Sequence, residues 1–197
     1  MTAHQVKAIG NLLTGYRSDL TYIRNFHRFK SKRSSEKDYC EKSEGTFKSF
    51  IDDFRVARNV EKNKTRKLLS FTLHWVHSKN ANDVDAFAHH LCKKGITHGK
   101  TMTSLSSKIL FLNNSWEIFP FDSIARNALC MKKNVYADYL PLVHQFRKKQ
   151  NKMIQECIKS VSPHLSIIEK EFVTEIHDIK TVRTNRFIDK LLWTTGS

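Results

Sequence analysis

A lysine and an aspartate in the middle of the chain are of the types that bond-breaking chemistry needs. Lys100 ends a glycine-rich turn at 95–100, and Asp122 follows Pro120 and Phe121, 22 positions after the lysine. A carboxylate beside a sugar stabilises the positive charge that develops there, or it activates a nucleophile. A lysine attacks as a neutral amine when desolvation lowers its pKa, and it binds phosphate when it stays charged. Both roles are open for Lys100.

The turn before Lys100 has the features of a phosphate-binding loop. A helix capped by Asn82 or Asp83 is predicted to end at 93–95, and a second helix is predicted from near Gly99 to Asn114. A turn that opens into a helix N-terminus presents backbone N–H groups to an anion. An ordinary helical hairpin is the alternative. We expect the DNA-binding residues to be Gly95, Thr97, His98, Gly99, Thr101, Ser104 and Arg126.

The charge of the chain favours a polyanionic partner. Lysine and arginine total 34 against 19 acidic residues, which gives a formal net charge of +15. Solubility alone requires a net charge of only about 2 to 8 in a small domain. Because cations that neutralise phosphates release counterions, this excess indicates nucleic acid, with a merely soluble basic protein as the alternative.

Two runs, 99–110 and 118–126, resemble the helix-hairpin-helix DNA glycosylase superfamily, in which a hairpin, a helix and a Pro-x-Asp loop occur in this order. Lys100 is most similar to the lysine of the 8-oxoguanine glycosylase branches, including the archaeal one. In those branches the lysine attacks the sugar and the aspartate assists. Gly95 and Gly99 enclose three residues, where the family's hairpin has one.

The resemblance implies an all-α, helix-hairpin-helix glycosylase-like fold. One compact or bilobal domain over 1–197 would have a central cleft for DNA and base, with the hairpin and catalytic loop at about 82–130. The implied activity is that of a DNA glycosylase, possessing AP lyase activity if Lys100 is the nucleophile. It would flip out a damaged or modified base and cleave its N-glycosidic bond, in base-excision repair or in antiviral defence against modified phage DNA. Asp122 is the expected catalytic carboxylate, and Lys108 is a weaker nucleophile candidate. The alternative for Asp122 is a plain helix cap, because Asp122 or Ser123 can cap the helix predicted through Ile124.

Two other classes of function remain open. A non-catalytic helical DNA- or RNA-binding protein would use the same turn and basic surface without chemistry. A helical protein-interaction adaptor would show little salt-dependent affinity for duplex DNA. The glycosylase hypothesis predicts a monomer whose partner is double-stranded DNA with a damaged or modified base.

Composition independently favours helices and argues against a metal. Gly is 6 and Pro is 3, which is too few for a sandwich or barrel of many turns. The four cysteines contain no Cys-x-x-Cys pair, so reduced thiols are expected. His89, His90 and His98 have no acidic residue or cysteine at a recognisable ligand spacing. We therefore expect neither a metal nor a cofactor.

The start of the chain and its hydropathy predict a cytoplasmic location, nucleoid-associated in a prokaryote or nuclear in a eukaryote. The first residues lack the apolar core of a signal peptide. No run approaches the roughly 20 apolar residues of a membrane span. No membrane partner is expected.

The remaining elements are predicted to be scaffold. Apolar spacing predicts one or two helices in 3–30 and helices at 46–60 and 64–77. The polar, basic segment at 28–44 is predicted to be a solvated connection, with a phosphate-contacting loop as the alternative. Trp75 is interpreted as core packing rather than a base-stacking residue. Either DNA contacts or solvation explains the other basic residues near the C-terminus: Arg183, Arg186 and the run 147–152. Further helices are predicted through Ile124 to Met131, from Tyr139, and from Pro163 to Trp193.

Overall fold

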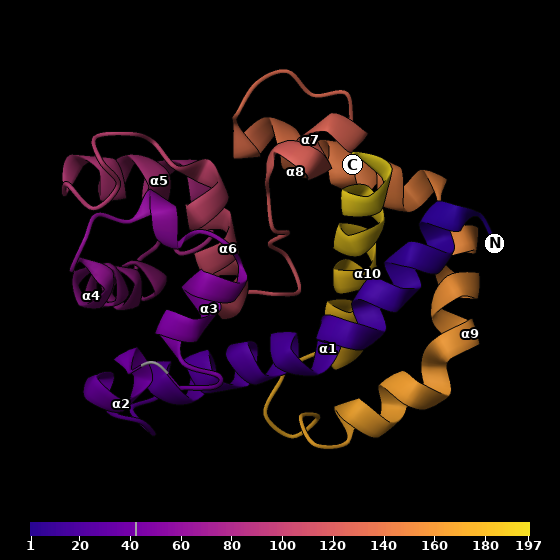
Figure 1. The fold of residues 1–197 in the computed structure, drawn as a ribbon, viewed down its shortest axis with the longest axis horizontal. Coiled ribbons are helices and arrows are strands. Elements are labelled where there is room, and N and C mark those ends of the chain that lie inside the picture. Colours follow the sequence, from indigo (N-terminus) through magenta and orange to yellow (C-terminus); the bar gives the residue numbers. More distant parts are fainter. Residues whose placement is uncertain (42) are drawn as a thin grey trace. The chain divides into compact units, whose positions relative to one another are not determined.

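The chain is helical throughout the residues that the structure describes. A computed structural model describes residues 1–41 and 43–197, and within them it has ten α-helices, one 3-10 helix and no strand (Figure 1). The predicted all-α class is confirmed. In the same residues no helix has both the length and the apolar character that crossing a bilayer requires. The α-helices are α1 (Ala3–Lys30), α2 (Glu36–Cys40), α3 (Phe47–Asp53), α4 (Thr65–Val76), α5 (Val84–Lys93), α6 (Thr103–Asn113), α7 (Ser123–Ala128), α8 (Tyr136–Lys149), α9 (Asn151–Glu169) and α10 (Ile179–Thr195).

The chain divides into two compact units. The middle unit comprises residues 21–118, and the terminal unit comprises residues 1–20 together with 119–197. The first part of α1 belongs to the terminal unit and the rest to the middle unit. A single domain over 1–197 stays a prediction.

In the middle unit, α6 is the central helix. Four consecutive apolar residues, 109–112, are all fully buried, so this helix is covered on every side rather than along one stripe. Helices α4 and α5 pack against it and against each other (Figure 1). The turn between α5 and α6 is therefore held by two packed helices.

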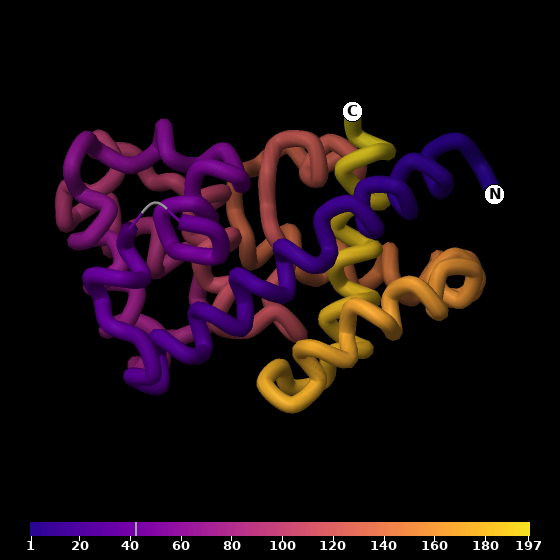
Figure 2. The backbone as a smooth tube through the Cα atoms, turned by 60° about the horizontal axis from the view of Figure 1, so that its bottom comes forward, coloured from indigo at the N-terminus to yellow at the C-terminus, as the bar shows by residue number. Residues whose placement is uncertain are grey.

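In the terminal unit, α10 is the helix around which the others assemble. It packs against α7 and α9, and Figure 2 shows it as the yellow tube beside the indigo start of α1. The imidazole Nδ1 of His4 lies 2.8 Å from the carbonyl oxygen of Thr194, which ties the start of α1 to the end of α10. Residues from both ends of the sequence thus form one core.

Several predicted boundaries are wrong. Pro163 does not start a helix but lies inside α9, and the final helix begins only after Asp178, whose carboxylate accepts the N–H of Thr181 at 3.3 Å. Helix α3 stops at Asp53 rather than near residue 60, and Arg55 has a left-handed φ of 54°. Single left-handed residues interrupt a right-handed helix, and apolar spacing does not reveal them.

The connection at 28–44 also contains a short helix, α2, that the polar composition did not predict. Its N-cap is Ser35, whose hydroxyl oxygen accepts the N–H of Asp38 at 3.1 Å. Serine at this position satisfies a backbone donor that the helix leaves unpaired. The helix places Tyr39 and Cys40 in the core.

Candidate functional site

Asp122 lies where the sequence predicts a helix cap. Its Oδ1 accepts hydrogen bonds from the backbone N–H groups of Ile124, at 3.1 Å, and Ala125, at 3.0 Å, and α7 begins with the next residue. The side chain is half-buried. Both cap bonds fall on the same carboxylate oxygen. Asp122 therefore has a demonstrable role in starting α7, whatever else it does.

Aromatic packing fixes the loop that carries Asp122. Phe121 is fully buried, with its ring edge-on to Tyr139 at 4.8 Å between centroids. The hydroxyl of Tyr139 donates to the carbonyl oxygen of Pro120 at 3.2 Å. Burial raises the pKa of Tyr139 well above its ordinary value, and the charges of Asp189 and Asp122 contribute in the same direction. The phenol thus keeps its proton and donates to the loop.

A second carboxylate, that of Asp189 on α10, interacts electrostatically with Asp122. Burial is the main reason that the pKa of Asp189 is raised, and the negative charge of Asp122 adds to the effect. Arg186 opposes it by pairing with Asp189 at 2.9 Å. The surroundings of Asp122 are therefore a set of buried, interacting polar groups in the terminal unit.

Arg126 lies one helical turn after Asp122 and is half-buried. It is one of the expected DNA-binding residues. Its buried Nε has no hydrogen-bond partner in the part of the chain that the structure describes. Contact with a ligand stays a prediction for this side chain.

The turn between α5 and α6 closes on itself before α6 begins. Gly95, His98 and Gly99 are left-handed, with φ values of 64°, 50° and 68°. The N–H of Lys100 donates to the carbonyl oxygen of Thr97 at 2.9 Å, and the hydroxyl of Thr97 donates to the carbonyl oxygen of Lys100 at 2.5 Å. Because this hydroxyl takes the carbonyl that a helix would use, the start predicted near Gly99 is wrong. Helix α6 begins at Thr103.

The expected DNA-binding residues of this region differ in exposure. His98, Gly99 and Thr101 are exposed, as is Lys100. Gly95 and Ser104 are half-buried. Thr97 is completely buried, and its hydroxyl serves the turn.

A carboxylate that the sequence analysis missed lies against the turn. Glu61 pairs with Lys64 and accepts a hydrogen bond from the backbone N–H of His98. The Lys64 ammonium holds the pKa of Glu61 below its ordinary value, with His98 contributing less. Lys64 also donates to the carbonyl oxygen of Gly95 at 2.5 Å, and the N–H of Glu61 donates to that of Ile96 at 2.9 Å. An anionic group of the protein thus occupies part of the expected phosphate-binding backbone.

The two nucleophile candidates belong to the middle unit, whereas Asp122 belongs to the terminal unit. Lys100 is exposed. Lys108 is half-buried on α6, and its Nζ donates to the carbonyl oxygen of Phe54 at 3.3 Å. The ammonium group of Lys108 therefore has a structural contact.

His89, His90 and Trp75 make structural contacts. Nδ1 of His89 lies 2.8 Å from the carbonyl oxygen of Asp85, and the rings of His90 and Trp75 are 5.3 Å apart. Trp75 also packs against Phe87 at 5.2 Å, as its interpretation as a core residue requires. Residues 1–41 and 43–197 contain no group of three or more histidine, cysteine or acidic side chains suited to hold a metal.

Two arginines of α10 form a buried ionic network. Arg186 is 1% exposed and pairs with Asp19 at 2.7 Å as well as with Asp189. Arg183 pairs with Glu169, which also accepts the hydroxyl of Tyr16 at 2.7 Å. Solvation, one of the two alternatives, is therefore wrong for Arg186, and contact with DNA stays a prediction. The sequence did contain one indication of a shared environment: Arg183 and Arg186 are three residues apart, and so lie on one face of a helix that carries buried apolar residues.

Comparisons of the chain with models of protein families, with curated proteins and with solved structures found no match. A function must therefore be argued from the residues themselves. Three features carry that argument: the carboxylate of Asp122, the turn before α6 and the positive charge of the chain.

Proposed function

We propose that this protein is a DNA glycosylase in which Asp122 is the catalytic carboxylate. The observation that carries the proposal is the order of the elements around it. Helices α5 and α6 form a packed hairpin with a glycine turn, and a buried aromatic loop then leads to Asp122 at the start of α7. The excess of 34 basic over 19 acidic residues suits a nucleic-acid substrate.

The reaction requires Asp122 to stabilise positive charge. As the bond between C1′ and the base breaks, the sugar gains positive charge, which a nearby carboxylate stabilises. A water molecule then adds its oxygen to C1′, one water proton is lost to solvent, and the departing base nitrogen takes up a proton. The product is a free base and an intact abasic site. The aromatic packing of the loop keeps the carboxylate in place and so lowers the cost of orienting it.

Lys100 offers a second route. If its neutral amine attacks C1′, the base leaves and a Schiff base forms between the lysine and the opened sugar, which leads to strand cleavage. If Lys100 instead contacts phosphate, the enzyme is monofunctional. The exposed position of Lys100 supports phosphate contact, because the backbone of a bound DNA strand can reach an exposed side chain.

A non-catalytic DNA- or RNA-binding protein is the second candidate. The observation in its favour is that the two cap bonds of Asp122 already account for this residue. In that case the basic surface and the turn would bind phosphates, and no bond would break. The substitution Asp122→Asn separates the candidates, since asparagine caps a helix as well as aspartate does but carries no charge.

The test is to incubate the protein with lesion-bearing duplexes, genomic DNA and heavily modified phage DNA, and to identify released bases by mass spectrometry. Release by the wild type that falls roughly a hundredfold or more in Asp122→Asn would support the proposal. Asp83→Asn, a substitution at the cap of α5, is the matched control and should keep full activity. Salt-sensitive binding to every DNA without base release would contradict it. Borohydride trapping, compared between wild type and Lys100→Gln, tests the lyase route.

A further inference from the structure

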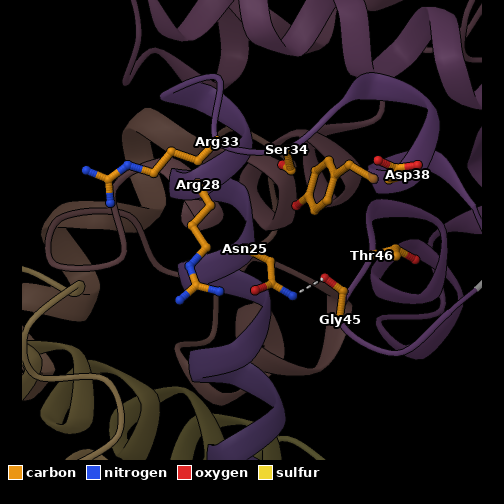
Figure 3. Close-up of a pocket in the computed structure, with 8 residues that line it drawn as sticks. Asn25, Arg28, Arg33, Ser34, Asp38, Gly45 and Thr46 are labelled. Atoms are coloured by element: carbon orange, nitrogen blue, oxygen red, sulfur yellow. Dashed lines mark hydrogen bonds between the residues drawn. The ribbon is translucent and has the colours of Figure 1, made fainter.

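We propose that a pocket at the end of α1 binds a nucleotide phosphate group. This phosphate pocket has a volume of about 250 Å³ and lies within the middle unit, where the C-terminal part of α1 meets α2 and the loop before α3 (Figure 3). The proposal does not depend on chemistry at Asp122. The side chains that carry it are Asn25, Arg28, Arg33, Ser34, Asp38 and Tyr39.

Two buried hydroxyl groups at the pocket have no partner among residues 1–41 and 43–197. Within this part of the chain, the Oγ of Ser34 and the phenolic oxygen of Tyr39 are both inaccessible to bulk solvent and make no hydrogen bond. Tyr39 is only 4% exposed. Buried polar groups in folded proteins nearly always have a partner, and both hydroxyls belong to residues that line the pocket, so a polar ligand there is the partner we infer for them.

Packing holds the hydroxyl of Tyr39 in position. Its ring stacks on Phe29 with 4.8 Å between centroids, and Phe47 lies on it at 6.2 Å. Burial raises the pKa of Tyr39 well above its ordinary value, so the phenol stays protonated and can donate a hydrogen bond. A fixed donor is what an anion requires, because binding then costs little reorganisation.

The arginines determine the class of ligand. Arg28 and Arg33 both lie at one side of the pocket, where the Arg33 side chain extends outward from the other lining residues (Figure 3). Both side chains are exposed, and a guanidinium group has planar donors that match phosphate oxygens. Asn25 is held in place by donating to the carbonyl oxygen of Gly45 at 2.9 Å. The volume exceeds what one water molecule needs and leaves room for a sugar attached to the phosphate.

One carboxylate opposes the two arginines. Asp38 accepts the hydroxyl of Ser35 at 2.6 Å, and the backbone N–H of Asp38 donates to the same hydroxyl at 3.1 Å. Its negative charge reduces the affinity of the pocket for an anion without cancelling two positive charges. The substitution Asp38→Asn should therefore strengthen phosphate binding, whereas loss of Arg33 should weaken it.

Calorimetric titration with inorganic phosphate, deoxyadenosine monophosphate and deoxyadenosine tests the pocket. We expect saturable binding of the two phosphate ligands and none of deoxyadenosine. Tyr39→Phe and Arg33→Gln should each weaken binding roughly tenfold or more, because each removes a donor to a charged group. Arg58→Gln removes an equal charge from an exposed site outside the pocket and should leave binding unchanged. Equal loss in Arg58→Gln, or no loss in Tyr39→Phe, would overturn the proposal.

Two further measurements keep the result interpretable. Tyr39→Phe removes only an unpartnered hydroxyl, so its melting temperature should match the wild type; if it unfolds instead, Ser34→Ala tests the second hydroxyl.

Oligonucleotides with and without a 5′-phosphate distinguish the source of the ligand. Preference for the phosphorylated end assigns the pocket to a phosphate monoester, and equal binding that still requires Arg33 assigns it to phosphates within the strand. Failure of these tests leaves base release by Asp122 unaffected, so the two proposals fail separately.

Discussion

The carboxylate of Asp122 is joined to the backbone N–H of Ala125 by a 3.0 Å hydrogen bond, so one side chain both starts α7 and is the proposed catalytic group. The two roles respond differently to substitution. Asp122→Asn should keep the stability of the wild type and lose base release, whereas Asp122→Ala should also lower the free energy of unfolding by about 1 kcal/mol. Urea denaturation of both variants measures the structural part.

Asp83 provides the control for this comparison. Its Oδ1 accepts the N–H of Ala86 at 2.9 Å, which is the same cap at the start of α5. Asp83→Ala should cost a similar unfolding free energy and leave base release per folded molecule intact. Parallel losses of activity in Asp83→Ala and Asp122→Ala would mean that Asp122 acts only through the fold.

The carboxylate against the α5–α6 turn should weaken DNA binding. Glu61→Gln removes a negative charge from the turn that presents the His98 N–H, so affinity for duplex DNA should rise several-fold, and the salt dependence should steepen. Fluorescence anisotropy at several salt concentrations measures both. Glu156→Gln, an exposed acidic residue on α9, changes the net charge equally and serves as control. An identical gain in Glu156→Gln would show that overall charge alone is responsible.

The buried network around Arg186 should dominate the stability of the terminal unit. Arg186→Met leaves Asp19 and Asp189 without their shared cation in a buried site, which should cost about 3 to 5 kcal/mol of unfolding free energy. Arg17→Gln removes an exposed ion pair with Glu171 and should cost less than about 1 kcal/mol. Chemical denaturation of both variants measures the two costs. Similar losses of unfolding free energy in Arg186→Met and Arg17→Gln would contradict the prediction that the buried ion pairs matter more than the exposed one.

His90 should make the stability of the middle unit depend on pH. Its pKa lies below the ordinary 6.5, first because burial disfavours the charged ring, and then because of Lys94 and His74. The folded state therefore favours the neutral ring. The contribution of His90 to the free energy of unfolding is therefore complete above pH 6.5, and it is lost as the pH falls through the lowered pKa.

The substitution His90→Phe tests this pH dependence, because it keeps an aromatic ring against Trp75 but does not titrate. The unfolding free energy of the wild type, minus that of the variant, should decrease between pH 7 and pH 5. His77→Phe, at an exposed position, is the control and should change this difference less. A difference that is constant with pH would show that His90 keeps the same pKa on unfolding.

Local sequence patterns were sufficient to predict the class of fold and several helix starts. The apolar spacing of 3–30 predicted what is one helix, and Asp83 and Asp122 each cap the helix expected of them. These features depend on residues within one or two turns of each other, so the sequence carries them directly. The positive charge is equally a property of the sequence alone.

Contacts between distant segments determined which polar residues are buried and which of them pair. The sequence shows Arg186 and Asp19 as two charged residues far apart, and only the packing of α10 beside α1 buries them as a pair. Similarly, Tyr39 is buried because the rings of Phe29 and Phe47 pack against its ring, and Glu61 reaches the turn because the segment before α4 lies against it. Burial and long-range pairing depend on which elements pack together, and that information exists only in the tertiary structure.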